Sequence, residues 1–276
     1  MSWKDNSPLA VFVNVAFEAW APGKAPGVSP MGNPLPSGLL DTQAASWGDF
    51  GRKRGIFRLL DILERQQTQA TVMVSRVLVD TASEALQAIT AAGHEICAHG
   101  FSQDALPISM DPEAERRTIL DCRDSIATLT GKAPVGWISP RGTPSLATAE
   151  ILADEGFEWF GDCFNDDRAY VNTYKKGSIV FLPLTMDVND LPLRMKYGHP
   201  PRAFVDVFEQ SLEGFLRYAD GTTHLDVTVH AHVSGRAAEA AAFEDVLTML
   251  RNRNDVWVTT RGEAAKHARD TIGADA

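Results

Sequence analysis

Short apolar runs and longer amphipathic segments alternate along the whole of this 276-residue chain. The short runs, rich in Val, Ile and Phe, are typical of buried strands, and the longer segments have the period of helices. This alternation predicts parallel strands joined by crossover helices, and hence an α/β protein. We expect strands at 10–17, 70–75, 94–98, 135–139, 159–162, 179–184, 225–230 and 256–259, and helices at 52–66, 83–92, 111–130, 145–155, 201–218 and 237–251.

One segment breaks the alternation. Residues 21–38 contain four glycines and five prolines, a composition that excludes regular secondary structure. Long loops without secondary structure are unusual inside compact domains unless they cover a functional site. Because this loop directly follows the first predicted strand, we expect it to lie over a pocket and to favour a small-molecule substrate.

The composition narrows the classes of function. A net charge of −10 argues against binding to nucleic acid or to anionic membranes, since both need clustered Lys and Arg. There is no run long enough for a membrane span, and the start, MSWKDNSPLA, lacks the features of a signal peptide, so we expect a cytoplasmic protein. Three widely spaced cysteines argue against a disulfide framework. The length suits a single α/β domain over residues 1–276.

Polar and ionisable residues lie at or just after the ends of six predicted strands. The carboxyl ends of parallel strands meet at one edge of a sheet or barrel, where catalytic groups are usually placed. A purely structural protein has little reason to collect such groups there. The candidate residues are Glu18, Trp20, His99, Gln103, Asp104, Arg141, Asp162, Asp166, Asp190, His230 and His232.

Several of these residues have two interpretations. His99, within GHEICAHGFSQD, is either a ligand or a structural histidine, and Arg141 either pairs with a nearby acid or faces a substrate. His230 and His232 are two residues apart, so a strand points both to the same side. That spacing suits metal ligands and general acid/base catalysis alike.

Several segments together resemble the polysaccharide deacetylase superfamily, which has the NodB-homology domain. The similarity is greatest to the branch of cytoplasmic peptidoglycan-deacetylase-like proteins, cyclic-imide hydrolases and a metal-independent allantoinase. The resemblance implies a distorted (β/α)7 barrel, hydrolysis of amide or related C–N bonds, and often a divalent metal held by one Asp and two His. The segments, in the order of the family, are RGIFRLLDILE, AGHEICAHGFSQD, LTGKAPVGWISPRG, EGFEWFGDCFNDD, NDLP, VTVHAHVSGR and VWVTT.

The resemblance also implies roles for individual residues. Glu18 matches the metal-binding acid after the first strand, and His99 matches the first histidine of the H-x-x-x-H motif. His230 matches the late histidine that acts as general acid toward the leaving group. Arg141 lies in the segment that holds the catalytic acids or lines the substrate pocket.

Two positions depart from the pattern of the family. Gln103 stands where the second metal histidine is expected, and Ala16 stands where the base aspartate is expected. A neutral amide oxygen is a poor zinc ligand. Either Asp104 or His232 therefore completes a zinc site with Glu18 and His99, or the pocket works without a metal, with Glu18 as general base.

These observations together predict a hydrolase that cleaves a linear amide, cyclic imide or ureide of small size. Trp20, Asp162, Asp166, Asp190 and His232 are expected to bind the substrate, the acids by accepting hydrogen bonds from its N–H groups. A deacetylase of N-acetyl sugars or polysaccharides is the alternative, and a non-catalytic ligand-binding protein is a second one. By analogy with the family we expect a homodimer or homotetramer.

Overall fold

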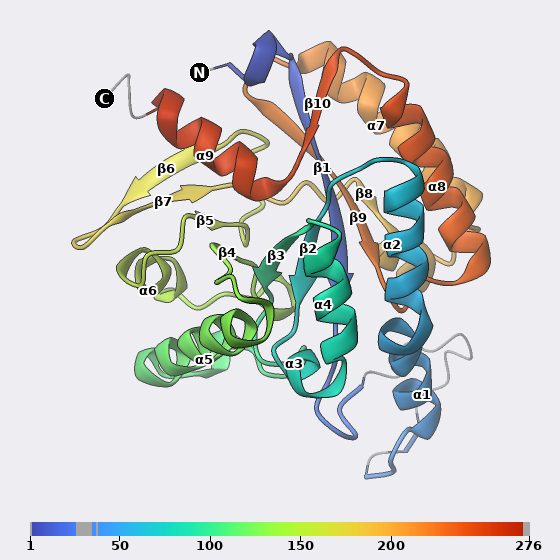
Figure 1. Cartoon of the computed structure of the whole chain (residues 1–276), viewed down its shortest axis with the longest axis vertical. Helices are drawn as coiled ribbons and strands as arrows, with labels where there is room; N and C mark the ends of the chain where they lie inside the picture. Colours follow the sequence, from blue (N-terminus) through green and yellow to red (C-terminus); the bar gives the residue numbers. More distant parts are fainter. Residues whose placement is uncertain (1, 26–34, 37, 273–276) are drawn as a thin grey trace.

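The strands of the protein form one curved sheet in the computed structural model, which describes residues 2–25, 35–36 and 38–272 (Figure 1). The strand order is β6-β7-β5-β4-β3-β2-β1-β9-β8, and β10 also pairs with β1. The strands are β1 (Leu9–Phe17), β2 (Thr71–Val74), β3 (Glu95–Ala98), β4 (Gly136–Trp137), β5 (Trp159–Phe160), β6 (Tyr170–Thr173), β7 (Ser178–Phe181), β8 (Val188–Asn189), β9 (Thr223–His230) and β10 (Val256–Thr259).

The central strand, β1, sets the direction of the sheet. It pairs with β9 along residues 9–16, and on its other edge it pairs first with β10 and then with β2. All of these pairings are parallel, and β1 is buried along its whole length. Strands buried on both faces read as continuous apolar runs, as β1 does. The carboxyl ends of β1, β2, β3 and β9 therefore point to one end of the sheet, here called the rim.

Helices cover the outside of the sheet, and α1 lies beyond the rim (Figure 1). Apolar side chains of α2, α4, α7 and α8 form one core with the outer face of the strands. The helices are α1 (Thr42–Phe50), α2 (Ile56–Arg65), α3 (Val77–Thr81), α4 (Ser83–Ala91), α5 (Pro112–Thr130), α6 (Thr148–Asp154), α7 (Arg202–Tyr218), α8 (Ala237–Arg251) and α9 (Arg261–Ile272), and the π-helical turn η2 (Gly51–Gly55) joins α1 to α2.

The signals that begin and end a helix are clearest in α5. The Asp111 side chain accepts a hydrogen bond from the Ala114 N–H, and Pro112 occupies the first turn, where its missing N–H costs nothing. Gly131 ends the helix with a φ of +77°, a conformation that glycine adopts without steric cost.

The inside of the curved sheet contains a buried ion pair. Arg261, at the start of α9, is fully buried and pairs with Asp226 of β9. Its Nε also donates to Asn14 Oδ1 (3.2 Å), and its guanidinium lies over the rings of Phe12 and Trp159. A buried charge is tolerated only where it is paired and hydrogen-bonded, and here both conditions are met.

The α/β class and the eight expected strands are confirmed, with small differences in their bounds. The structure adds β6, β8, α1, α3 and α9, which the sequence analysis did not predict. β6 runs antiparallel to β7 and forms a hairpin at the edge of the sheet. Of the loop predicted at 21–38, residues 26–34 and 37 lie outside the described residues.

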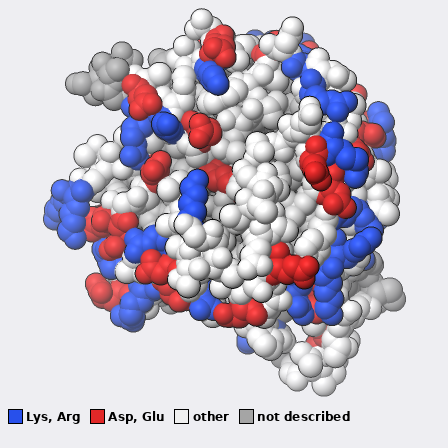
Figure 2. Space-filling view, viewed as in Figure 1, with Lys and Arg blue, Asp and Glu red and all other residues white. Residues whose placement is uncertain are grey.

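The face of the protein shown in Figure 2 lacks the clustered Lys and Arg that binding to nucleic acid or anionic membranes needs. Acidic and basic side chains are interspersed on the face shown in Figure 2, and no large basic area is visible there. Within the described ranges, no helix is both long and apolar enough to cross a membrane.

Candidate active site

Four of the candidate residues meet at the rim. Glu18 follows the last residue of β1, His99 follows β3, and His230 ends β9, with His232 two residues later. Glu18 Oε1 lies 3.3 Å from His99 Nε2 and 3.8 Å from His230 Nε2. Glu18 Oε2 lies 4.0 Å from His232 Nδ1. The parallel register brings these ends together, so one buried carboxylate is surrounded by three imidazoles.

His230 is held by Asp190, which lies directly after β8. Asp190 Oδ1 lies 2.6 Å from His230 Nδ1, and Oδ2 accepts hydrogen bonds from the His230 N–H (2.8 Å) and from Ser234 Oγ (2.6 Å). Burial lowers the pKa of His230, but the charges of Asp190 and Glu18 and the hydrogen bond to Asp190 outweigh burial and raise this pKa to about 9. At neutral pH His230 is therefore an imidazolium with Nε2–H directed toward Glu18.

Glu18 is ionised in this setting. Burial raises its pKa, but the charge of His230 and the hydrogen bond with His99, with smaller effects of His232, bring it down to about 2. A carboxylate with such a low pKa is a weak proton acceptor as long as His230 keeps its charge.

The ring of His99 has a fixed orientation. Its Nδ1 lies 2.7 Å from the carbonyl oxygen of Ile138, and because a carbonyl only accepts, Nδ1 must carry a proton. Nε2 is thereby turned toward Glu18. The hydrogen bond between Nε2 and the ionised Glu18 needs a second proton, on Nε2. The backbone just after β4 thus orients the imidazole that adjoins the carboxylate.

His232 lies in an aromatic setting and is uncharged at neutral pH. Its ring makes edge contacts with Trp20, Trp47 and His230, at centroid distances of 5.3, 5.0 and 5.7 Å. Burial lowers its pKa to about 4, although the charge of Glu18 acts in the opposite direction. His230 and His232 thus flank one carboxylate, the first charged and the second neutral. Such differences are often found where acid and base roles are divided between two groups.

Two glycines of η2 allow this arrangement. A Cβ on Gly51 would lie 3.1 Å from the His232 backbone nitrogen, and one on Gly55 would lie 1.9 Å from the carbonyl oxygen of Ala231. The π-helical turn therefore packs directly on the backbone between the two histidines. π-Helical turns are frequent at functional sites.

The zinc site proposed with Asp104 is not formed. Asp104 is exposed, and its Oδ1 accepts from the Ala21 N–H (2.8 Å) in the loop after β1. Gln103 is buried, and its amide bridges Ser75 Oγ (3.2 Å) and the Arg141 N–H (3.2 Å). Residues 2–25, 35–36 and 38–272 contain no group of three or more His, Cys, Asp or Glu placed to hold a metal ion. Neither Gln103 nor Asp104 therefore serves as the third ligand of the metal centre that the resemblance implies, and zinc held by Glu18, His99 and His232 stays a prediction.

The remaining candidates have mixed outcomes. Asp190, expected to contact the substrate, has both oxygens engaged by His230 and Ser234, so it is placed to hold His230. Asp166 accepts from the N–H groups of Asp167 and Arg168 and from Arg168 Nε, so it stabilises its own turn. Arg141 is exposed, with a φ of +58°.

Asp162 is buried beside the backbone of Ser139. Both of its oxygens accept from the Ser139 N–H, at 2.8 and 2.7 Å. Burial raises its pKa to about 6, against the lowering effect of Ser139 and of the charge of His99. Asp162 is therefore a carboxyl group that changes charge close to neutral pH. Its assignment to substrate binding stays a prediction.

Three side chains of this region were not predicted from the sequence. Trp47 belongs to α1. This helix has few apolar residues, so their helical spacing is too weak to recognise in the sequence. Ser234 and Arg236 lie in VTVHAHVSGR, a segment in which only the two histidines drew attention. The short distance of Ser234 and Arg236 from His232 in the sequence was the one signal that could have found them.

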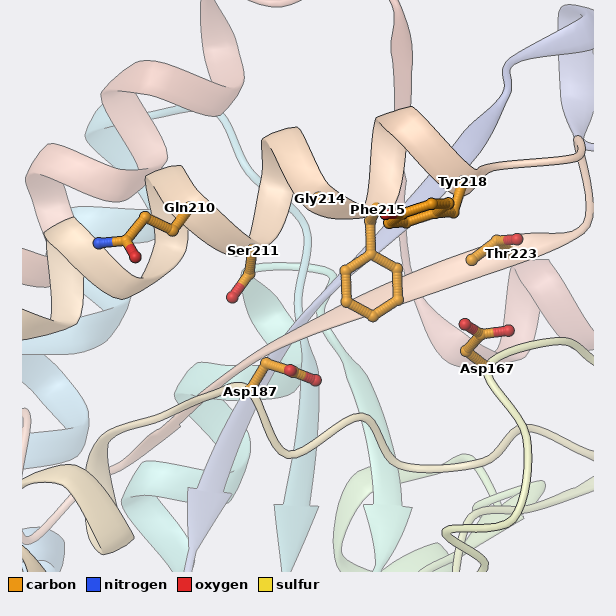
Figure 3. Close-up of a pocket in the computed structure, with 8 residues that line it drawn as sticks. All are labelled: Asp167, Asp187, Gln210, Ser211, Gly214, Phe215, Tyr218 and Thr223. Carbon is orange, nitrogen blue, oxygen red and sulfur yellow. The ribbon is translucent and has the colours of Figure 1, made fainter.

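A separate cavity of about 360 Å³ lies beside α7, away from the four rim residues (Figure 3). Asp187 and Asp167 lie on either side of the Phe215 ring there, and Ser211 and Tyr218 complete its wall on the helix. None of the Glu18, His99, His230 and His232 side chains lines it. The catalytic candidates therefore do not form this cavity.

Comparison with known proteins agrees with this geometry. Residues 48–160 match the family described as Polysaccharide deacetylase. A protein of Helicobacter pylori named Peptidoglycan deacetylase is 28% identical over 247 residues, which cover 78% of this chain and 84% of that protein.

The fold has close counterparts among solved structures. The structure described as a probable polysaccharide deacetylase from Pseudomonas aeruginosa has a TM-score of 0.87 at 24% identity, covering 97% of this chain and 93% of the other. The structure of Puue allantoinase has a TM-score of 0.88 at 23% identity, covering 98% and 93%. These likenesses confirm the distorted (β/α)7 barrel. The family match over residues 48–160 and the relative in Helicobacter pylori identify a polysaccharide deacetylase domain in this chain, and they support a hydrolase of carbon–nitrogen bonds other than peptide bonds.

Proposed function

We propose that the protein hydrolyses an amide, cyclic imide or ureide of a small molecule, with Glu18 and His230 exchanging protons with the reactants. One observation carries this proposal: a buried imidazolium, fixed by Asp190, faces a buried ionised carboxylate across 3.8 Å. Hydrolysis of a C–N bond needs a base for the attacking water and an acid for the departing nitrogen, and this pair supplies both.

The proton transfers follow from the orientation of the two groups. The water oxygen attacks the carbonyl carbon while Glu18 accepts a water proton. As the C–N bond breaks, its electron pair goes to nitrogen, which takes the Nε2 proton of His230. Transfer of the proton from Glu18 to His230 then restores both groups. His99 orients Glu18. Asp190 keeps the Nδ1 proton of His230 in place, so that Nε2 is the nitrogen that gives its proton to the substrate.

The low pKa of Glu18 fits a coupled reaction. The charge of His230 is the largest of the effects that lower this pKa. Once His230 begins to give its proton to the nitrogen, that effect weakens and Glu18 becomes a stronger base. Each transfer therefore assists the other, which favours a substrate whose leaving nitrogen contacts His230 directly.

Metal-independent catalysis is the form of the mechanism that the residues support. The Gln103 amide and Asp104 are engaged in structural hydrogen bonds, as described above. The competing form uses zinc held by Glu18, His99 and His232. The zinc content of protein purified without chelator tests it, since a stoichiometric zinc that is required for activity contradicts the metal-independent form.

The exposed apolar side chains in the segments that follow strand ends are both aliphatic and aromatic: Leu39, Leu40, Ile108 and Leu146 on one hand, Phe101 and Phe164 on the other. This surface therefore suits a small substrate and a sugar alike. A deacetylase of N-acetyl sugars is the second candidate, and the similarity to the peptidoglycan deacetylase of Helicobacter pylori favours it.

A substrate screen tests the proposal directly. Purified protein is incubated with cyclic imides, ureides, small amides and N-acetylated sugar oligomers, with and without added zinc. We expect hydrolysis of at least one small compound without zinc, abolished by Glu18→Gln and unaffected by the surface control Tyr218→Ser. Acetate release from the sugar oligomers alone would favour the second candidate. Specific binding without turnover of any compound would favour a ligand-binding protein. A cytoplasmic location and a homo-oligomer stay predictions.

A further inference from the structure

Three unsatisfied polar atoms gather on one side of His232. Trp47 Nε1, His232 Nδ1 and Arg236 Nε are buried, and each has no hydrogen-bond partner among the described residues. Native proteins satisfy the great majority of such groups, and an unmade bond costs about 1–3 kcal/mol. Three in one place therefore indicate that something outside the described chain satisfies them.

The three side chains contact one another and reach the active site. The Trp47 ring lies 5.0 Å from the His232 ring, and the Arg236 guanidinium carbon lies 5.4 Å from the Trp47 ring centre. His232 Nδ1 in turn lies 4.0 Å from Glu18 Oε2. Trp47 is only 8% exposed and His232 only 1%. The cluster is thus an extension of the Glu18 site in which Trp47 and His232 are buried and Arg236 is half-buried.

Arg236 forms no close ion pair among the described residues, although the charge of Glu239 acts on it. Its guanidinium packs on the Phe50 ring (4.3 Å), and its Nη2 donates to the carbonyl oxygen of Trp47 (3.4 Å). Glu239, three residues later, pairs with Arg194 instead (3.0 Å). Arg236 is also the N-cap of α8 and provides no side-chain cap, so the first N–H groups of that helix add positive potential nearby.

The chemistry of the unsatisfied atoms defines the missing partner. Trp Nε1 and Arg Nε only donate hydrogen bonds, so the group between them must accept. Arginine stacked on aromatic rings is especially suited to planar carboxylates. Other acceptors, such as the carbonyl of a neutral sugar amide, would leave the charge of Arg236 without compensation.

We propose that Trp47, His232 and Arg236 form a subsite for a carboxylate on the substrate, so that the protein acts on small amides or ureides that carry a carboxylate near the scissile bond. This inference rests on the proposed function for the position of the scissile bond. It adds a recognition group that the hydrolysis of simple imides or acetylated sugars does not require. Because the three atoms are shielded in the free protein, the side chains around them must shift to admit the carboxylate.

Binding to matched compounds tests the subsite without depending on turnover. The probes are the N-carbamoyl and N-acetyl derivatives of glycine and phenylalanine, each as the free carboxylate and as the primary amide. By calorimetry, we expect the wild type to bind at least one carboxylate about 10- to 100-fold more tightly than its amide, the range for hydrogen bonds to charged groups. Arg236→Gln should remove this preference without changing the affinity for the amide.

Three variants separate recognition from folding. Arg236→Lys keeps the charge and should retain part of the preference, whereas Trp47→Phe keeps the ring but removes the N–H and should weaken carboxylate binding about 3- to 10-fold. Arg202→Gln, on the exposed surface of α7, removes one positive charge elsewhere and should change nothing. Thermal melts check that each variant is folded.

The outcomes distinguish this inference from the proposed function. Equal affinity for both members of every pair, binding of none, or a preference that survives Arg236→Gln overturns the subsite. Carboxylate-selective binding without hydrolysis of any probe supports the subsite and counts against the proposed reaction. Hydrolysis of a probe without carboxylate selectivity supports the proposed reaction and counts against the subsite.

Discussion

The inner ion pair and the rim cluster are both buried and polar, but they differ in how their groups are satisfied. Inside the sheet, the carboxylate of Asp226 is matched by the guanidinium of Arg261 and by hydrogen bonds from Asn14 and Thr185. At the rim, Glu18 faces three imidazoles, and His232 Nδ1 has no partner within the described ranges. The inner groups stabilise the fold, whereas the rim groups keep polar atoms available for hydrogen bonds to reactants.

The difference predicts opposite responses to substitution. Removing one member of a satisfied pair leaves an uncompensated charge and costs stability. Altering a group held for chemistry costs mainly activity, with a smaller effect on folding. Four measurements test this contrast.

The largest effect is expected for Glu18→Gln. It removes the proton acceptor and should lower kcat about 10³- to 10⁴-fold, at the upper end for a general base. The low pKa of Glu18 means that its charge also stabilises the fold, so the melting temperature should fall, but less than for Asp226→Leu, because His230 keeps Asp190 as its counter-charge. Steady-state kinetics on the substrate found by the screen, with thermal melts on the same samples, give both values. A kcat within tenfold of the wild type would remove Glu18 from the catalytic step.

Asp226→Leu should give the reverse result. Arg261 would remain buried without a counter-charge, at a cost of about 3–5 kcal/mol in the free energy of unfolding. Urea unfolding measures this loss, and kcat should remain near the wild-type value at temperatures where the variant is folded. The exposed pair of Arg202 and Asp206 offers a control, since Asp206→Leu should change the free energy of unfolding by less than about 1 kcal/mol.

Asp162→Asn should make the protein more stable at neutral pH. The folded-state pKa of about 6 lies above the ordinary value of 3.8, so the folded state binds more protons between these pH values. The free energy of unfolding therefore falls as pH rises from about 4 to 6 and stays low above it. Since one pKa unit corresponds to about 1.4 kcal/mol, the loss is about 3 kcal/mol at most.

The side-chain amide that replaces the carboxyl group of Asp162 would still accept from the Ser139 N–H but would carry no charge. Urea unfolding at pH 4.5 and 7.5 should therefore show a pH-dependent difference in the wild type that is smaller in the variant. The same pH dependence in both proteins would assign it to another group.

The smallest effect is expected for Ser234→Ala. It removes one of the hydrogen bonds that hold Asp190, worth about 1 kcal/mol. We expect kcat to fall a few-fold with KM unchanged, and the alkaline limb of the pH–rate profile to shift, because Asp190 sets the pKa of His230. An unchanged profile would mean that Asp190 needs no help from Ser234.

The sequence predicted the elements that depend on periodicity and the residues that depend on position at a strand end. Glu18, His99 and His230 fall directly after or at the ends of apolar runs, so parallel pairing brings them to one place. The direction of loop side chains follows no such rule. Asp104 is adjacent to Gln103 in the sequence, yet it points to the Ala21 N–H rather than to Glu18.

Other features escaped prediction because they depend on contacts between distant segments. Asp190 appeared as one acid in DVND, and only the pairing of β8 with β9 shows that it holds His230. Trp47 lies in a helix whose apolar period is interrupted by Gly48, and its meaning comes from His232, far along the chain.

The close approach of Gly55 to the Ala231 carbonyl fixes the position of the turn that carries both histidines. Any side chain at position 55 would push the turn after β9 outward and displace His230 and His232 together from Glu18. A single added methyl group would thus alter two reacting distances at once. Position 55 is therefore unsuited to changing the space around Glu18, because a substitution there would move both imidazoles together.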